Sequence, residues 1–356
     1  MGIILYLEIG FKHVLQNPLL SVLVIAHERK EFILDAIDSL RNQLDQKDNY
    51  EVIVVKKFRD NAIDSLILSF GYQNIITDKN SLGEKIYVAL SYCKGQFISF
   101  LEDDDLFVTE KIREIIKKIK ENKNLIYIHN DHITIDLNGK ITGKKLGKSI
   151  KNSMLLNLKK CSFIELARLS KYDPDFNLSS ITINVKTVEK NKEMLNKTNF
   201  SLDAFMYFVA ISSEEGSILL FKKELTKFRY YKKNGLTIVP INGRTIESVK
   251  NFAELQLDFD KKMLYAMQGR HAKKILKMRV IEDELKLSIL NDEISKNISI
   301  PNTLLLSVYA LRIGEFYKVK LVLLGLLNLI NHELSQKLYV KGNLFSSKHY
   351  PDIPET

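Results

Sequence analysis

The alternation of short apolar runs with helical patterns is the feature that most constrains the fold of this chain. Four runs rich in β-branched residues read as buried strands, at 21–26, 50–55, 74–77 and 96–101. Amphipathic helical patterns follow these runs, at 29–44, 62–71, 82–95 and 106–124. This rhythm, with short connections, predicts an α/β fold: a mostly parallel, Rossmann-like sheet flanked by helices. Ligands of such sheets bind beyond the carboxyl ends of the strands.

The rest of the chain changes its pattern twice. Extended segments are predicted at 125–136, 179–185, 217–221 and 225–232, with a helix over 201–216 and a glycine-rich basic loop over 137–152. From about residue 245 the pattern is helical, with segments at 246–290 and 303–339 and a junction near Gly314. We therefore expect three parts, namely an N-terminal extension (1–17), an α/β domain (18–240) and a C-terminal helical domain (241–356).

A run of four acids directly follows the predicted strand at 96–101, namely Glu102, Asp103, Asp104 and Asp105. Two unit charges about 4 Å apart repel by roughly 4 kcal/mol at the effective dielectric of a protein surface. Because the run falls at the predicted ligand edge, a divalent cation that shares the site explains it better than a solvated turn. Mg²⁺ and Mn²⁺ prefer carboxylate oxygens and bridge them to substrate phosphates. The alternative is an acidic turn that stabilises the N-terminus of the next helix.

Composition narrows the partners without choosing one. The chain has 53 Lys and Arg against 43 Asp and Glu, a formal net charge of +10, which favours anionic ligands. Basic motifs with interleaved aromatics are not visible, so no nucleic-acid partner is expected. The two cysteines, Cys93 and Cys161, lack metal-type spacing and predict reduced thiols in a cytoplasmic protein. We expect neither a signal peptide nor a segment of roughly 18 apolar residues able to cross a bilayer.

Four segments resemble, in order and spacing, the motifs of the family 2 glycosyltransferases. They read SVLVIAHER, EVIVV, KNSLGEKIYVALSYCKGQFISFLEDDD and SLDAFMYFVAISSEEG, and the resemblance covers roughly residues 18–235. It implies the GT-A fold, a nucleotide-sugar donor and Mn²⁺ or Mg²⁺ as cofactor. It also implies transfer of a sugar, with inversion, to a hydroxyl of a glycan or lipid-linked saccharide.

The resemblance assigns roles to individual residues of this sequence. Contacts with the nucleotide sugar fall on Ala26, His27, Glu28, Arg29, Asn80, Gly83, Lys85, Asp103 and Asp104. Metal ligation falls on Asp104 and Asp105, whereas Glu102 stands where the family commonly has an aspartate. An inverting transferase needs a general base that deprotonates the acceptor hydroxyl. That role falls on Asp203, at the start of the helix predicted over 201–216.

The sequence also departs from the family pattern. Lys56 and Lys57 follow the second strand, where the family commonly has an acidic turn that contacts base and ribose; Asp60 lies further on. Two tyrosines follow Arg229, where the family often has Arg-x-His. The nucleobase therefore stays open. The rival functions are a non-catalytic nucleotide- or glycan-binding module of the same fold and a nucleotidyltransferase. The absence of glycine from IAHERKEF counts against the latter.

The helical tail has two interpretations. Its apolar residues at helical spacing suit a bundle that packs on itself, on the α/β domain or on a second copy in a homodimer. The segment KVKLVLLGLLNLINHEL, at 318–334, places an apolar block beside basic residues. That pattern is typical of a helix lying in the plane of a membrane surface. The second interpretation predicts peripheral contact with the cytoplasmic face of the membrane.

Overall fold

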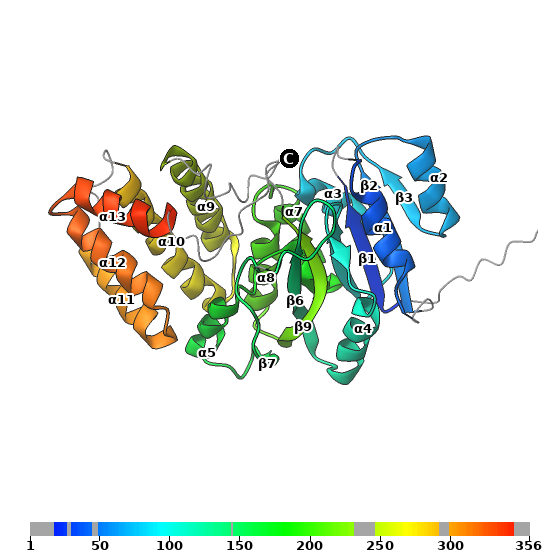
Figure 1. The fold of residues 1–356 in the computed structure, drawn as a ribbon. Coiled ribbons are helices and arrows are strands. Elements are labelled where there is room, and N and C mark those ends of the chain that lie inside the picture. Colours follow the sequence, from blue (N-terminus) through cyan, green and yellow to red (C-terminus); the bar gives the residue numbers. More distant parts are fainter. Residues whose placement is uncertain are drawn as a thin grey trace, which may run out of the picture.

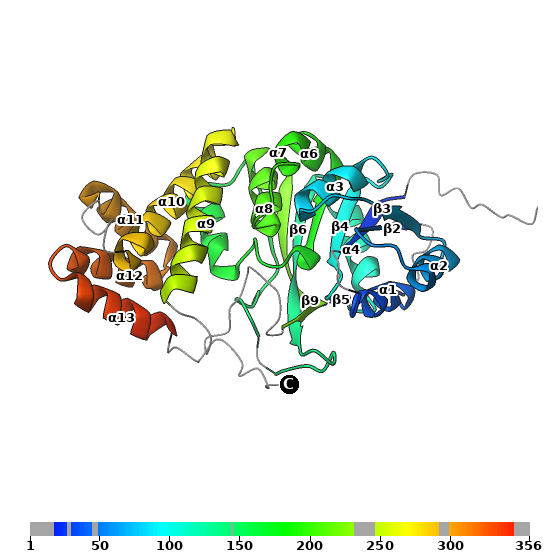
Figure 2. The same ribbon diagram turned by 90° about the horizontal axis from the view of Figure 1, so that it is seen from above.

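The computed structural model describes residues 18–26, 30–44, 49–143, 145–230, 246–291 and 299–344. Helices flank a mixed sheet at one end of the molecule, and the helices of the C-terminal segment form the other end (Figures 1 and 2). The N-terminal extension lies outside the described residues, and so does the predicted domain boundary near residue 240. The site candidates His27, Glu28 and Arg29 also lie outside them. The division into three parts stays a prediction.

The first half of the sheet is parallel, as predicted. Its strands are β1 (Leu20–Ile25), β2 (Tyr50–Lys56), β3 (Gln73–Ile76) and β4 (Phe97–Glu102), in the spatial order β3-β2-β1-β4. The connecting helices are α1 (Ile33–Arg41), α2 (Asn61–Ser69) and α3 (Leu82–Leu90). Every residue of β1 is buried, which is why this strand has no polar–apolar alternation. The predicted fold class is confirmed.

The second half of the sheet mixes directions. It contains β5 (Leu106–Phe107), β6 (Leu125–Ile135), β7 (Met154–Asn157), β8 (Ile181–Asn184) and β9 (Ser217–Arg229). The order continues β4-β8-β6-β9-β5, with β8 antiparallel to both neighbours, β6 parallel to β9, and β7 paired with β9. Short helices connect these strands, namely α5 (Phe163–Ala167), α6 (Val185–Glu189) and α7 (Lys192–Leu195).

Three sequence predictions were wrong at their boundaries. The helix predicted over 106–124 begins only at Lys111 (α4, Lys111–Glu121), because 106–107 pairs with β9 as strand β5. The two closing strands predicted at 217–221 and 225–232 are one continuous strand, β9. The segment predicted as a strand at 179–185 begins with a 3₁₀ turn, Leu178–Ser180, which leads into β8. Each error concerns pairing with a distant segment, which a local pattern does not contain.

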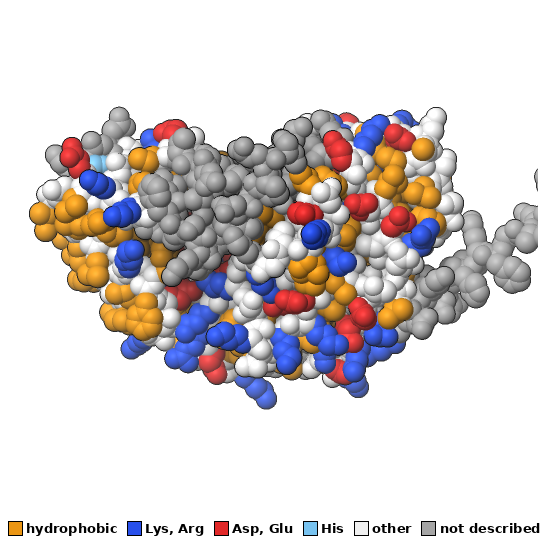
Figure 3. All heavy atoms as spheres, in the orientation of Figure 1, with side chains coloured by type: hydrophobic (Ala, Val, Ile, Leu, Met, Phe, Trp, Pro, Cys, Tyr) orange, Lys and Arg blue, Asp and Glu red, His pale blue; other side chains and the backbone are white. Residues whose placement is uncertain are grey.

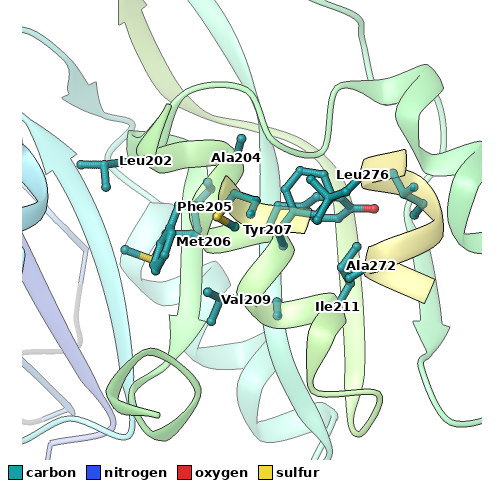
Figure 4. Close-up of a cluster of buried hydrophobic side chains, with 14 of the residues drawn as sticks. Leu202, Ala204, Phe205, Met206, Tyr207, Val209, Ile211, Ala272 and Leu276 are labelled. Atoms are coloured by element: carbon teal, nitrogen blue, oxygen red, sulfur yellow. The ribbon is translucent and has the colours of Figure 1, made fainter. Parts of the chain in front are cut away.

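Helix α8 (Leu202–Ser212) packs between the sheet and the helical tail. Nine of its residues are buried, so it is apolar on all sides. Figure 4 shows its side chains packed together with Ala272 and Leu276 of α10 (Arg270–Leu290). One hydrophobic core therefore runs from the strands through α8 into the C-terminal helices.

The tail consists of helices α9 (Ile246–Ala266), α10 (Arg270–Leu290), α11 (Ile300–Ile313), α12 (Phe316–Asn328) and α13 (His332–Leu344). The junction predicted near Gly314 is confirmed: this glycine ends α11 with a φ of 76°. The segment predicted at 303–339 as two helices contains a third, α13, which begins at His332. None of the described helices combines the length and apolar character that crossing a bilayer requires.

Gly83 provides a test of the close packing between α3 and the backbone of 195–198. It is buried near the start of α3, and a Cβ atom there would collide with the backbone carbonyl oxygens of Leu195 and Thr198. We expect Gly83→Ala to lower the free energy of unfolding by about 3 kcal/mol, since backbone cannot move aside cheaply. The matched control is Gly71→Ala, with open space around its Cβ and a φ of +75°. It should lose only about 1 kcal/mol. Equal losses in urea denaturation would contradict this account.

Candidate active site

The four acids lie where β4 ends, at the carboxyl edge of the parallel strands. The backbone N–H of Asp103 donates to the Ile25 carbonyl at the end of β1, 3.2 Å away, so the run stays attached to the sheet. The N–H of Asp105 donates back to the Glu102 carbonyl, which turns the chain. Asp103 and Asp105 are buried, whereas Glu102 and Asp104 are half-buried. The four positions are therefore not equivalent.

Arg229, at the end of β9, holds this acidic turn in place. Its backbone N–H donates to Asp105 Oδ1 at 2.9 Å, and its Nε donates to the Asp104 carbonyl at 2.8 Å. The guanidinium also donates to the Leu137 carbonyl, pairs with Asp35 at 3.0 Å and lies over the Phe32 ring. The arginine that resembles the first member of the family's Arg-x-His therefore fixes the backbone of the acidic turn.

Burial and mutual repulsion oppose ionisation of the acids. Burial, followed by the charges of Asp105 and Asp104, raises the pKa of Glu102 well above its usual range. Burial and the Asp104 charge raise the pKa of Asp105 to about 7. A cation added at this edge would lower these pKa values, because it favours the charged form of each carboxyl. The site is thus electrostatically suited to a positive ligand.

Asp203 lies at the start of α8 and is held by three hydrogen bonds. Its Oδ1 accepts from the Ala204 N–H at 2.9 Å and from the Ser201 hydroxyl at 3.3 Å. Its Oδ2 accepts from the Asn177 N–H at 3.2 Å. Ser201 has a left-handed φ of 51°, so the chain enters α8 through a sharp turn that presents the aspartate.

A short segment, Asn177–Ser179, connects Asp203 to the acidic run. While the Asn177 N–H binds Asp203, the Ser179 hydroxyl accepts the N–H of Glu102 at 3.0 Å. The Asn177 side chain caps the 3₁₀ turn by accepting the Ser179 N–H at 2.8 Å, with Asn177 at a φ of 63°. The structure therefore brings Glu102 and Asp203, 101 positions apart in sequence, to the two ends of one turn.

The electrostatic environment of Asp203 suits a weak base. Burial and then the charge of Asp175 raise the pKa of Asp203 to about 6. The charge of Asp203 in turn contributes to the raised pKa of Glu102, after burial and the charges of Asp105 and Asp104. A carboxyl with a pKa near the working pH is well matched to general-base catalysis.

A buried lysine also contacts the turn Asn177–Ser179. Lys111, at the start of α4, donates to the Ser179 carbonyl and, at 2.9 Å, to the Thr226 hydroxyl of β9. Burial lowers the pKa of Lys111 well below its usual range, while the charge of Asp105 acts in the opposite direction. Sequence reasoning missed Lys111, because an alternation of lysine and isoleucine on an amphipathic helix predicts an exposed lysine.

The side chains at this edge could hold a metal ion only if a substrate supplied the remaining ligands. Among the described residues, no group of three or more His, Cys, Asp or Glu side chains is arranged to hold a metal ion. Mg²⁺ is commonly bound by one or two carboxylates plus substrate phosphates, so an all-protein cage is not needed. The half-buried Asp104 and its neighbours fit that mode. Buried Asp105 has Arg229 as a structural partner, and its assignment as a metal ligand stays a prediction.

The described donor-binding candidates occupy the neighbouring strand ends. Ala26 follows β1 directly, and its N–H donates to the Val55 carbonyl. Asn80 is exposed just before Ser81, which caps α3 with a capping box that includes Glu84. Lys85 is fully buried on α3. Their roles toward a nucleotide sugar stay predictions.

The departure from the family pattern after β2, where a lysine pair replaces an acidic turn, has a structural explanation at Lys56. The ammonium of Lys56 is buried, pairs with Asp64 of α2, donates to the Phe58 carbonyl at 2.6 Å and lies over the Phe58 ring. Asp60, which could have replaced the missing acidic turn, caps α2 and pairs with Lys30 at 2.9 Å. This corner is therefore an internally paired cluster.

Comparison with known proteins agrees with this geometry. Residues 21–174 match the family model described as Glycosyl transferase family 2. An uncharacterized glycosyltransferase of Haemophilus influenzae is 28% identical over 117 residues, 32% of this chain and 38% of that protein. The poly(ribitol-phosphate) beta-glucosyltransferase of Bacillus spizizenii is 27% identical over 112 residues, 30% of this chain and 18% of that protein. The alignments thus span well under two thirds of these relatives.

Solved structures extend the similarity to the helical tail. The crystal structure of S. aureus TarS 1–349 in complex with UDP-GlcNAc superposes with a TM-score of 0.59 at 14% identity. It covers 91% of this chain and 92% of that one. The same fragment in complex with UDP gives a TM-score of 0.58. At this identity the similarity shows the fold alone, the GT-A fold with C-terminal helices.

Arg229 allows a direct test of how the acidic turn is held. We expect Arg229→Lys to lower the free energy of unfolding by about 3 kcal/mol, because lysine cannot reproduce the forked contacts of a buried guanidinium. The control is Asp35→Asn, which removes only the exposed partner and should cost no more than about 1 kcal/mol. Urea denaturation measures both. A loss for Asp35→Asn as large as for Arg229→Lys would show that the ion pair, and not the backbone contacts, matters.

Proposed function

We propose that this protein is an inverting, metal-dependent glycosyltransferase that uses a nucleotide-sugar donor. The observation that carries the proposal is the turn Asn177–Ser179, which holds the acidic run and Asp203 side by side. Inverting transfer needs the base and the donor diphosphate on opposite sides of one anomeric carbon. The family match supports glycosyl transfer, and TarS bound to UDP-GlcNAc supports a nucleotide sugar as donor.

In the proposed reaction, Asp203 accepts the proton of the acceptor hydroxyl as that oxygen bonds to the anomeric carbon. The bond between the anomeric carbon and the diphosphate oxygen breaks, and the nucleoside diphosphate leaves with the bonding electron pair. The hydrogen bonds from Asn177 and Ala204 orient the carboxylate. Burial keeps it basic enough to act near neutral pH.

The proposed metal ligands are Asp104, as the main one, and Asp105. A bound Mn²⁺ or Mg²⁺ supplies charge stabilisation for the departing diphosphate. Asp103 would contact the donor's ribose or the metal's water. Arg229 holds the backbone of this turn at Asp104, so it would position this proposed ligand.

The proposed acceptor is a hydroxyl of a glycan or a lipid-linked saccharide. The poly(ribitol-phosphate) beta-glucosyltransferase among the relatives supports a polymeric or glycan acceptor. A non-catalytic module of the same fold is the rival that Lys56 favours, since this lysine replaces an acidic contact. The raised pKa of Asp203 favours catalysis instead, because binding alone does not need a carboxyl with a raised pKa at this point.

The pH dependence of transfer tests the role of Asp203. The ionised carboxylate is the active form, so kcat/KM should fall tenfold per pH unit below about 6 and level off above it. Because the charge of Asp175 raises the pKa of Asp203, Asp175→Asn should move this break to lower pH. A break that stays in place in the variant would assign it to another group. Asp175 itself forms an ion pair with Arg279, whose Nη1 lies 2.7 Å from Asp175 Oδ2.

Removal of the base should separate turnover from donor binding. We expect Asp203→Asn to lower kcat by about 10²- to 10⁴-fold, the usual contribution of a general base. The donor's dissociation constant, measured by isothermal titration across a panel of nucleotide sugars with Mn²⁺, should stay within a few-fold. A variant with full turnover would exclude Asp203 as the base. If the parent protein binds a nucleotide sugar but shows no turnover, the non-catalytic module is favoured.

The metal proposal predicts a different loss for Asp104. Asp104→Ala should abolish the Mn²⁺-dependent gain in donor affinity and metal-dependent transfer, because the other two aspartates of the run, Asp103 and Asp105, are more buried. Asp38→Ala, an exposed acid on α1, is the control and should leave both unchanged. If donor binding to the parent protein is the same with Mn²⁺ and with a chelator, the metal dependence is wrong and the fold assignment is unaffected.

A further inference from the structure

We propose that α11 and α12 form a docking surface for an anionic lipid bilayer. We name the C-terminal apolar surface by its exposed large apolar side chains, which are Ile300, Leu304, Leu305, Val308, Leu311, Phe316, Leu323 and Ile330. Figure 3 shows hydrophobic side chains gathered over these helices, with Lys and Arg side chains among them. This surface lies at the end of the molecule away from β1–β4 (Figure 1).

Helix α11 supplies the most regular part of the surface. Leu304, Val308 and Leu311 are 52%, 52% and 57% exposed and follow each other at helical spacing. The opposite face of the helix is buried, with Leu306, Tyr309, Ala310 and Ile313 in the core. An amphipathic surface helix normally has charged or polar residues on the face away from the core. Helix α11 is apolar on both faces, so its outer face is suited to a second apolar environment.

The structure relocates the surface that the sequence pattern indicated. Part of the segment predicted to lie on a membrane, 318–334, belongs to the core, because Leu321, Val322 and Leu324 are buried. Gly325 approaches Leu285 of α10 so closely that no Cβ would fit. The exposed large apolar side chains near α12 are Phe316 and Tyr317 at its start, Leu323 within it, and Leu329 and Ile330 just beyond its end.

The charges around the surface favour an anionic partner. Among the described residues 299–344, the exposed charged side chains are Arg312, Lys320, Glu333, Lys337 and Lys341, four basic and one acidic. Lys318 is already neutralised by Glu282 and Glu315, at 2.7 and 3.0 Å. The exposed charge of residues 299–344 is therefore predominantly positive. Apolar burial together with attraction to anionic headgroups is how in-plane helices bind membranes.

The same charges argue against a second copy of the chain as the occupant. A two-fold symmetric dimer brings the same patch of both copies together, so two predominantly basic sets of side chains, Arg312, Lys320, Lys337 and Lys341 of each copy, would be brought close to one another. Among the exposed side chains of residues 299–344, Glu333 alone is acidic. A bilayer has no such cost, since lysine and arginine can extend to the headgroups while leucine enters the acyl boundary.

Vesicle flotation of the full chain tests this proposal. We expect the protein to float with phosphatidylcholine vesicles that contain about one third phosphatidylglycerol, and to be released at about 0.5 M salt, where screening is strong. Leu304→Glu combined with Leu311→Glu should lower the bound fraction at least tenfold. Lys320→Gln combined with Lys337→Gln should lower binding to anionic vesicles by about 30-fold, the loss expected for two charges at roughly fivefold each.

The matched control is Leu68→Glu, an exposed leucine on α2 that is 61% exposed and far from the tail in the sequence. It should bind vesicles like the parent protein. Circular dichroism checks that each variant is folded, and light scattering reports the oligomeric state. The proposal is overturned if the parent protein stays unbound, if Leu68→Glu loses as much binding as the α11 variant, or if the α11 variant converts a dimer to a monomer without any vesicle binding.

Discussion

The turn at Asn177–Ser179 is the constraint on which the rest of the site depends. Its backbone and side chains bind the helix start at Asp203, the strand end at Glu102 and the buried ammonium of Lys111. These groups come from α8, β4 and α4, so one 3₁₀ turn determines how three elements meet. Asn177 holds a left-handed φ there, and its side chain caps the turn, which explains why a short polar residue occupies the position.

The site accumulates buried charge that the fold by itself does not need. Glu102, Asp105 and Asp203 all have raised pKa values, mainly because they are buried, and Lys111 has a lowered one. Burying ionisable groups opposes folding unless they find partners. Strained or electrostatically unfavourable groups commonly cluster at functional sites. A metal ion with a diphosphate would relieve the carboxylates of the acidic run, and a hydroxyl proton would neutralise Asp203.

The helical tail is connected to the site by packing and by charge. Helix α8 carries Asp203 at its start and packs along its length against α10 (Figure 4). Arg279 of α10 pairs with Asp175 at 2.7 Å and with Asp260 of α9 at 2.8 Å, and it lies over the Phe208 ring of α8. Because Asp175 influences the pKa of Asp203, the tail takes part in setting the properties of the proposed base.

The sequence predicted the parts of this arrangement that depend on local sequence patterns. Buried parallel strands appear as uninterrupted β-branched runs, so β1 to β4 and the edge occupied by the acids were predictable. The unequal roles of the acids were predicted, but the contacts that hold them were not, because these depend on Arg229, 124 positions beyond Asp105. Strand β5 and the buried state of Lys111 were missed for the same reason: each depends on pairing with β9. The paired cluster of Lys56 and Asp64 also joins separate elements.

The central claim is that donor and base meet at the two ends of the Asn177–Ser179 turn. A crystal structure with bound Mn²⁺ and a nucleotide sugar, read through the anomalous signal of manganese, tests it most directly. The account predicts a manganese peak in contact with the Asp104 carboxylate and the donor diphosphate, and an anomeric carbon whose free face points toward Asp203. Manganese away from Asp104, or a donor that turns its leaving group toward Asp203, would contradict it.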